Sequence, residues 1–215
     1  MKTEQLVAAL VADRRPAVRP FGRSTGRSVG TAIAAGGIAS LVVFALAFGP
    51  RVDLAAAFTT WRFDLKLVLV LVALLAALSG CIAMARPIAA RSLWRRALPL
   101  VLLAAAALVI ELVVLPRTSW ATRLVGSNSM VCLTAIPLFA LAPLAGLIVA
   151  LRRSAPSSPT RAGAMAGALA ATVAAAIYAF HCFDDSPLFV LTWYPLAALP
   201  VIALGALAGN RLLRW

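Results

Sequence analysis

Six apolar runs, each close to the length of a membrane-spanning helix, constrain this chain more than any other feature of its sequence. They lie at about 29–49, 65–85, 97–116, 130–151, 162–180 and 188–210. A helix needs roughly 20 apolar residues to cross the hydrocarbon core of a bilayer. Hydrophobic residues make up 63% of the 215 positions, whereas soluble domains have roughly 45–50%. The sequence therefore predicts an all-α membrane protein, a six-transmembrane-helix bundle in the lipid bilayer.

The charges between the runs predict its orientation. Fifteen of the 20 lysines and arginines fall in the N-terminal segment 1–28, the connections 86–96 and 152–161, and the tail 211–215. Positively charged connections remain in the cytoplasm, so we expect both termini there. The chain then divides into an N-terminal cytoplasmic segment 1–28, a transmembrane domain 29–210 and a short cytoplasmic tail 211–215.

The N-terminal segment predicts a short helix followed by a basic linker. Its apolar residues recur at helical spacing and would share one face: Leu6, Val7, Leu10 and Val11. The linker that follows is broken by proline and glycine and contains Arg14, Arg15 and Arg19. A helix of two to three turns is marginal alone in water. We therefore expect it to order against a partner or the lipid surface.

Composition excludes two broad functions. The net charge of +13 is divided among small groups between the apolar runs, whereas a nucleic-acid-binding surface gathers its basic residues on one soluble face. We therefore expect no direct contact with nucleic acid. The chain has none of the common hydrolase, nucleotide-binding or dinucleotide-binding motifs, and a single histidine cannot form a multi-histidine metal site. An enzyme is not expected.

Small residues and prolines predict details of helix packing. Gly163 and Gly167 in the fifth run, and Gly205 and Gly209 in the sixth, form small-xxx-small patterns that let helices approach closely. The fourth and sixth runs contain two prolines each: Pro137, Pro143, Pro195 and Pro200. A proline inside a helix leaves a backbone carbonyl without its usual donor, so we expect partners for these carbonyls within the bundle.

The stretch 181–194, between the fifth and sixth runs, is the main candidate for function. It contains the only histidine, His181, together with Cys182, Asp184 and Asp185. The predicted topology brings Cys132 to the same outer end as Cys182. These two cysteines either form a disulfide, or hold a soft metal ion with His181 or a carboxylate, or pack as small hydrophobic side chains.

Three acids each have two interpretations, and one further cysteine has a single one. Asp184 and Asp185 form either a proton or metal site or a solvated turn before a helix that starts at Pro187. Glu111 is the one acid in the middle of a run, and it serves either transport or a structural hydrogen bond. Cys81 lies near the inner end of the second run, where packing is expected.

Several motifs resemble one known family. They are the N-terminal Met1–Leu6 with its basic linker, Cys132-Leu133 with the following prolines, the terminal Gly209-x-Arg211-Leu212-Leu213-x-Trp215, and above all the stretch 181–194, HCxDDSPxFVxxWY. This pattern is similar to that of the NrsF family of bacterial inner-membrane anti-sigma factors, and the resemblance covers nearly the whole chain.

The resemblance implies a function and two sensing residues. It implies a six-span protein of the bacterial inner membrane that holds an extracytoplasmic-function sigma factor inactive and releases it under stress. The cysteines that it associates with sensing fall on Cys132 and Cys182, and no resident cofactor is implied beyond a transient soft metal ion at this pair. On this hypothesis segment 1–28 docks the sigma factor, and an oxidant or heavy metal acts at the cysteines, near His181, Asp184 and Asp185.

Two rival functions remain open from sequence. One is a small cation or proton transporter or channel with Glu111, Asp184 and Asp185 on its pathway, although no internal repeat supports it. The other is a structural membrane subunit that does not respond to thiol reagents.

Overall fold

The computed structural model describes residues 3–12, 21–85, 93–154 and 156–214. These residues form α-helices, short turns and loops, and no β-strand occurs among them. Six helices in the described ranges are long and apolar enough to cross a membrane. The expected all-α fold with six long apolar helices is therefore confirmed.

The long helices follow the six apolar runs. They are α2 (Phe21–Ala47), α4 (Trp61–Met84), α5 (Leu93–Val114), α7 (Ser129–Leu151), α8 (Pro159–Tyr178) and α9 (Pro187–Leu212). α2 begins at Phe21, eight residues before the expected run, so it extends into the segment expected to be a linker. Pro159 and Pro187 stand in the first turns of α8 and α9, where a proline removes no helical hydrogen bond.

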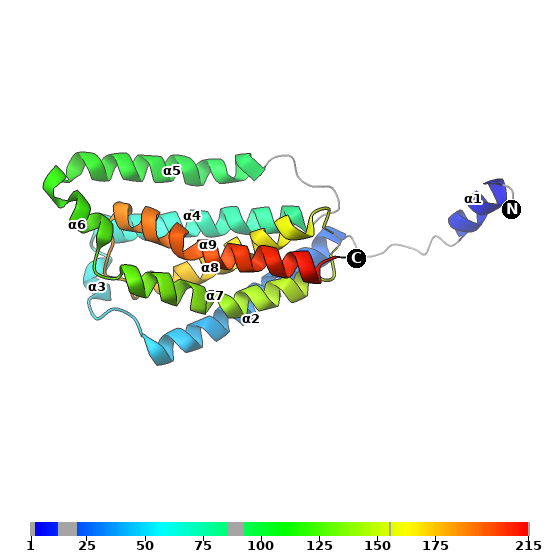
Figure 1. Cartoon of the computed structure of the whole chain (residues 1–215), viewed down its shortest axis with the longest axis horizontal. Coiled ribbons are helices and arrows are strands. Elements are labelled where there is room, and N and C mark those ends of the chain that lie inside the picture. Colours follow the sequence, from blue (N-terminus) through cyan, green and yellow to red (C-terminus); the bar gives the residue numbers. More distant parts are fainter. Residues whose placement is uncertain (1–2, 13–20, 86–92, 155, 215) are drawn as a thin grey trace.

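Three short elements were not expected from sequence. α3 (Leu54–Ala57) lies between α2 and α4, and the 3₁₀ helix η1 (Arg117–Ser119) leads into α6 (Trp120–Val125) between α5 and α7. All three lie at the same end of the bundle as the connection between α8 and α9 (Figure 1). The first residue of α2 and the last turn of α9 lie at the opposite end. The bundle therefore has one end made of short structured connections.

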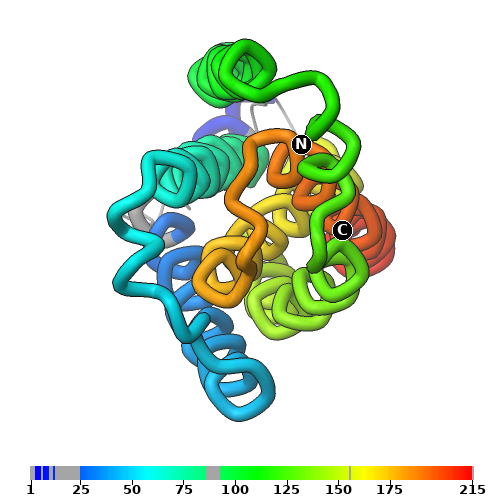
Figure 2. Tube along the Cα trace, turned by 90° about the vertical axis from the view of Figure 1, so that its left-hand side faces the viewer, coloured from blue at the N-terminus to red at the C-terminus, as the bar shows by residue number. Residues whose placement is uncertain are grey.

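α8 occupies the centre of the bundle. It packs against α9, α7, α4 and α2, and the view along the helices shows these four arranged around it (Figure 2). Its alanine-rich sequence explains this position, because small side chains let several neighbours approach at once. α5 lies at the periphery, against α4 and α9. Only 11% of its apolar span is buried, against 56% for α8.

The glycines of α8 and α9 pack face to face, as the sequence predicts. A Cβ atom added to Gly163 would lie 2.7 Å from the Cα of Gly209, and one added to Gly205 would lie 3.0 Å from the Cα of Gly167. No side chain fits at these distances. The two backbones are therefore in direct contact along the glycine faces.

One of the prolines has the expected carbonyl partner. Pro143 has no N–H to bond the carbonyl of Phe139 one turn earlier in α7. The hydroxyl of Ser40 on α2, which is 2% exposed, donates to that carbonyl at 2.6 Å and also to the carbonyl of Gly36 at 2.9 Å. This bond ties α2 to α7. Pro99 places a further proline inside a helix, in α5, which the sequence interpretation did not include.

The N-terminal helix α1 (Thr3–Ala12) is separate from the bundle (Figure 1). Every side chain that is described on it is exposed, and Val7 is 53% exposed. The side chains of Leu6, Leu10 and Val11 lie outside the described residues, as do Arg14, Arg15 and Arg19 of the linker. The predicted short helix is therefore present, and the side chains that are described on it are not buried by any other described part of the chain.

Replacing Gly163 by leucine tests the glycine contact. We expect Gly163→Leu to lower the free energy of unfolding by roughly 1–3 kcal/mol or more, because the new side chain must separate α8 from α9. Thermal unfolding in detergent, followed by tryptophan fluorescence, measures this. The control is Gly30→Leu in α2, where nothing lies within 4 Å of an added Cβ. Equal stability of the two variants would contradict the close packing.

Candidate functional site

The connection between α8 and α9, residues 179–186, is the candidate site, and below it is called the 179–186 loop. It leaves α8 by backbone bonds from His181 and Cys182 to the carbonyl of Tyr178, at 2.9 and 3.1 Å. It enters α9 through Ser186, which precedes Pro187 with extended backbone. Between these ends its side chains and carbonyls contact four other segments. The loop therefore joins these segments to one another at the end of the bundle that is made of short structured connections, which is called the structured end below.

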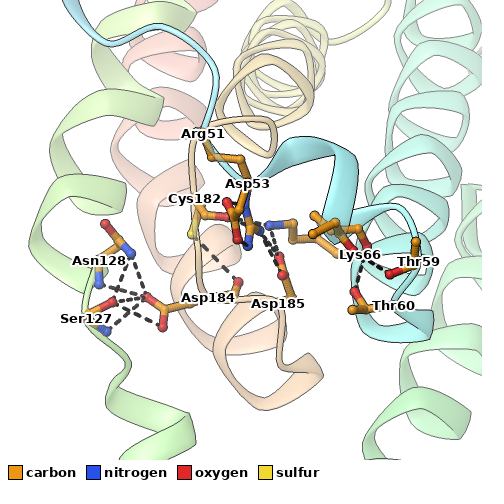
Figure 3. Close-up of polar contacts among 12 residues, drawn as sticks. Arg51, Asp53, Thr59, Thr60, Lys66, Ser127, Asn128, Cys182, Asp184 and Asp185 are labelled. Carbon is orange, nitrogen blue, oxygen red and sulfur yellow. Dashed lines mark hydrogen bonds and ion pairs between the residues drawn. The ribbon is translucent and has the colours of Figure 1, made fainter.

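Asp185 neutralises two buried cations. Its carboxylate accepts a hydrogen bond from Arg51 Nη1 at 2.8 Å, and another from the ammonium of Lys66 (Figure 3). Lys66 is fully buried and Arg51 is 8% exposed. The Lys66 ammonium also donates to the carbonyl of Cys182 at 2.8 Å. Because a buried charge without a partner is very costly, this carboxylate determines where the loop can lie against α4.

Arg51 also bonds Asp53, just before α3, and so extends the charge cluster of Lys66, Arg51 and Asp185. Its guanidinium bonds Asp53 through two nitrogens, each at 2.7 Å, donates to the Cys182 carbonyl at 3.2 Å, and lies 4.8 Å from the ring centre of Phe183. The hydrogen bonds with Asp53 and then Asp185 raise the pKa of Arg51 above its ordinary value. The same Arg51 contact lowers the pKa of Asp53. Both residues therefore stay ionised at neutral pH.

Asp184 binds the start of α7. Its Oδ2 accepts hydrogen bonds from the backbone N–H groups of Ser127 and Asn128 at 2.9 and 2.8 Å, and from the Asn128 side chain at 3.0 Å (Figure 3). A carboxylate at this position also complements the positive end of the helix. Gly126 permits the approach, since its φ is +61° and an added Cβ would lie 2.7 Å from the Asp184 carboxyl carbon.

Glu111 is paired, and its position differs from the expected one. It lies in the last turn of α5, near the structured end, and not in the middle of a span. Its fully buried carboxylate accepts bonds from Arg62 Nε at 3.1 Å and from the Ser186 hydroxyl at 2.8 Å. The structural interpretation of Glu111 is therefore the one that the geometry supports. The same contacts attach α5 to the 179–186 loop.

His181 contacts the end of α2 and the residues just after it. Its Nδ1 lies 3.0 Å from the carbonyl of Gly49, and its ring packs edge-on against Phe48, with ring centres 5.1 Å apart. In the described ranges, no three side chains among histidine, cysteine, aspartate and glutamate are grouped so that they could hold a metal ion. His181 therefore does not join the cysteines as a third ligand in this arrangement, and a soft metal would rely on the two sulfurs.

Cys132 and Cys182 lie in one buried cluster at the structured end. Cys132 is in the first turn of α7, and both cysteines are 0% exposed and belong to the same cluster of buried residues. Both are free thiols. The Cys182 thiol donates a weak hydrogen bond to the carbonyl of Asp184 at 3.7 Å. Burial raises the pKa of Cys182, and the nearby Lys66 ammonium opposes that shift. At neutral pH the thiol is therefore protonated.

Cys81 lies apart from this pair, near the far end of α4, and is fully buried. Arg51, Lys66, Arg62 and Ser186 are the site residues that the sequence interpretation did not single out. Lys66 offered a signal, because a lysine inside an apolar run needs an acidic partner. Nothing in the sequence indicates which acid that partner is.

Comparison with known proteins gives the family. The model of the NrsF family, described as "Negative regulator of sigma F", matches residues 10–215 of this chain. The chain belongs to the NrsF family. The resemblance inferred from the sequence motifs is therefore confirmed. The match begins within α1, so most of that helix precedes it.

Two curated relatives carry the same family name. The probable anti-sigma-F factor NrsF of Azospira oryzae is 31% identical over 86 residues, which are 40% of this chain and 38% of the relative. The anti-sigma-F factor NrsF of Caulobacter vibrioides is 34% identical over 84 residues, 39% of each chain. This chain thus covers about two fifths of the length of these relatives. No solved structure matches it.

The polar contacts in this NrsF-family chain indicate a structural role for Asp184, Asp185 and Glu111. Asp184, Asp185 and Glu111 each accept at least two hydrogen bonds from groups of the protein. An acid on an ion pathway has to exchange its partners for the moving ion.

Replacing Asp185 by asparagine tests the charge cluster. We expect Asp185→Asn to lower the free energy of unfolding by roughly 3–5 kcal/mol, because Lys66 stays buried without a counter-charge. Thermal unfolding of the detergent-solubilised protein measures the loss. Asp64→Asn, an exposed acid in the first turn of α4, is the control, with an expected change within about 0.5 kcal/mol.

A double variant tests whether the stability is lost because the Lys66 ammonium has no counter-charge. Adding Lys66→Met to Asp185→Asn removes the unpaired ammonium, so much of the lost stability should return. If Asp185→Asn costs no more than Asp64→Asn, the carboxylate does not hold the cluster together.

Proposed function

We propose that this protein is a membrane-bound anti-sigma factor that holds an extracytoplasmic-function sigma factor inactive and releases it when Cys132 and Cys182 react. The match of the NrsF family model to residues 10–215 carries this proposal. The names of both curated relatives, anti-sigma-F factors, agree with it. The arrangement of the described residues adds support. α1 lies beyond one end of the bundle (Figure 1), whereas Cys132, in the first turn of α7, and Cys182, in the 179–186 loop, belong to the other end.

The membrane is the bacterial inner membrane, with both termini in the cytoplasm. Six apolar helices support a multi-pass protein, and the excess of lysine and arginine in segments 1–28, 86–96, 152–161 and 211–215 supports this orientation. The structured end with the 179–186 loop then faces the periplasm. Signal and sigma factor therefore act on opposite sides of the bilayer.

The sigma factor docks on α1 and the linker after it. Leu6, Val7, Leu10 and Val11 provide the apolar anchor, and the basic residues Arg14, Arg15 and Arg19 provide its rim. Anchors of this type supply affinity, while rim charges mainly tune association rate and specificity. A short helix of this length gains order by binding. Because α1 is attached to the bundle, its effective concentration is raised only when the sigma factor also binds another part of the same assembly.

The signal is an oxidant or a soft metal ion that reaches the two cysteines from the periplasmic side. An oxidant that takes up two electrons and two protons would join the sulfurs in a disulfide, and a soft metal ion would displace both protons and bind two thiolates. Since both side chains are 0% exposed, the structured end has to open for either reaction. α7 and α9, each with two internal prolines, are the helices whose packing would change.

Bonds to sulfur are strong enough to supply the free energy that a switch between two packings of the bundle requires. Moving a two-state equilibrium from 1:99 to 99:1 needs about 5.5 kcal/mol of differential binding. Two metal–thiolate bonds, or one disulfide, formed in only one of the two packings would meet it. No other cofactor takes part in this mechanism.

A single charge on α1 tests the docking step. On a helical wheel Val7 lies on the apolar face and Ala9 on the opposite one, and both are exposed. We expect Val7→Asp, or deletion of residues 2–12, to reduce co-purification of the sigma factor at least tenfold, because an interface anchor is lost. Ala9→Asp is the matched control and should retain binding. Unchanged co-purification after the deletion would exclude α1 as the docking element.

The cysteines are tested by response and not by stability. With Cys132 and Cys182 both replaced by serine, the ratio of sigma-dependent reporter expression with and without a thiol oxidant should fall to about one, because no sulfur remains to react. Cys81→Ser is the control, since Cys81 is buried near the other end of α4. A double variant that is still induced as strongly as the parent would remove the cysteines from the mechanism.

A further inference from the structure

α2 runs from the structured end of the bundle into the segment that the proposed function assigns to docking. It is continuous from Phe21 to Ala47 and contains no proline. Its first two turns, residues 21–28, are also the last part of segment 1–28. A helix of this length spans about 40 Å at a rise of 1.5 Å per residue. α2 therefore joins the region of the signal to the region of the partner.

At the structured end, the 179–186 loop holds the residues that follow α2. The ring of Phe48 packs edge-on against that of His181, with ring centres 5.1 Å apart, and His181 Nδ1 lies 3.0 Å from the Gly49 carbonyl. The backbone N–H of Arg51 donates to the Phe180 carbonyl at 2.9 Å. A displacement of the loop therefore acts directly on this end of α2.

A second contact fixes α2 against α7, seven residues before α2 ends. The Ser40 hydroxyl, which is 2% exposed, donates to the Phe139 carbonyl at 2.6 Å. One turn earlier, a Cβ atom added to Gly36 would lie 2.7 Å from the backbone nitrogen of Pro143. The two backbones therefore touch at this level, and the Ser40 bond holds them in register. Below, this contact is called the Ser40 contact.

The half of α2 nearer to Phe21 lies beside space. An open groove of about 620 Å³ runs along it, lined mainly by small side chains of α2 and α7, among them Ala35 and Ala145. On another side of the same half, Val29 is fully buried, so these turns rest on the bundle in this arrangement. Small side chains obstruct a change of tilt very little. The groove side of α2 therefore permits movement.

We propose that α2 moves as one rigid helix about the Ser40 contact, and so transmits a displacement of the 179–186 loop to segment 1–28. This inference rests on the proposed roles of these two regions and names the helix that couples them. A helix keeps its backbone hydrogen bonds within itself in the bilayer, so it stays continuous when it tilts. Ser40 is a positioning residue in this mechanism, because it fixes the level about which α2 turns.

The place of Ser40 along α2 enlarges the movement at the docking side. Phe48 lies eight residues after Ser40, or about 12 Å along the axis, and Phe21 lies 19 residues before it, or about 29 Å. A rotation about Ser40 therefore moves Phe21 about twice as far as Phe48, and in the opposite direction. A small change in the loop becomes a larger one in segment 1–28.

The test measures the position of α2 in the purified full chain, without a sigma factor and without a thiol reagent. Spin labels attached to noncanonical amino acids at Gly30 and Arg161 leave the native cysteines in place. Both positions are exposed, and nothing lies within 4 Å of an added Cβ at Gly30. Double electron–electron resonance then gives the distance from α2 to the first turn of α8.

Loosening the loop should move α2, and removing the Ser40 contact should prevent that movement. We expect Asp185→Asn, which weakens the bonds of the loop to Lys66 and Arg51, to change the mean distance by about 1–2 Å, the size of helix shifts in known switches. In a chain with Ser40→Ala, adding Asp185→Asn should change the distance much less, because the level about which α2 turns is lost.

Thr31→Val is the matched control for Ser40→Ala. It also removes a hydroxyl from α2, but the Thr31 hydroxyl bonds the Ser28 carbonyl of its own helix, at 3.0 Å. With Thr31→Val, the effect of the loop variant on the distance should remain in full. A merely destabilised α2 would give the same result in both backgrounds.

A milder variant keeps the test decisive if Asp185→Asn does not fold. His181→Phe retains an aromatic ring in the loop and removes the contact of Nδ1 with the Gly49 carbonyl, so it releases α2 directly. A distance equal to that of the parent in the loop variant would overturn the proposal. A full change that persists with Ser40→Ala would overturn it as well.

The outcome is separable from the proposed function. The distances are measured without a sigma factor and without chemistry at the cysteines, so failure of capture or of induction leaves this result untouched. Conversely, if α2 does not move, the anti-sigma proposal still stands, and only the assignment of α2 as the coupling helix is lost.

Discussion

A fully buried lysine ammonium is the constraint on which the structured end of this bundle depends. Lys66 has no exposed surface, and a charge in such surroundings is tolerated only with a partner of opposite sign. Asp185 is that partner, and it also binds Arg51. Because Asp185 lies on the connection between α8 and α9, pairing Lys66 places that connection against α4. Asp184 and Ser186, its neighbours, then reach α7 and Glu111 of α5. One short loop in this way joins four separate segments, and Cys182, two residues before Asp184, lies within the same set of contacts.

Cys182 is hydrogen-bonded to several segments of the structured end. Its carbonyl accepts hydrogen bonds from Lys66 and Arg51, and its thiol contacts the Asp184 carbonyl. In the proposed sensing mechanism, a bulky adduct, a bound metal ion or a new bond to Cys132 would displace the backbone that these groups hold. α8 lies at the centre of the bundle and ends four residues before Cys182, so it connects the loop to the end of the bundle where α2 begins. A packed bundle of this type moves between discrete arrangements more readily than it deforms.

The sequence was sufficient for the helices and for part of the site. Run length determined the six long helices, and glycine spacing predicted the contact between Gly163 and Gly209, because backbone proximity requires the absence of side chains. Alternating topology brought Cys132 and Cys182 to one end. The partners of the charges were not predictable, since they depend on how each helix is rotated about its axis, and packing sets that rotation. Glu111 illustrates this. Its apolar run, 97–116, was expected to continue beyond the residue at which α5 ends, Val114. Glu111 therefore lies near the structured end, where it contacts Arg62 and Ser186.

Hydrogen exchange of the full chain in detergent, before and after modification of Cys182, tests most directly the claim that this one loop holds the structured end together. The account predicts that modification lowers amide protection in the 179–186 loop and also in the segments bonded to it: around Arg51, around Lys66, at the end of α5, and at Ser127 and Asn128. Loss of protection confined to residues 179–186, with the bonded segments unchanged, would contradict it.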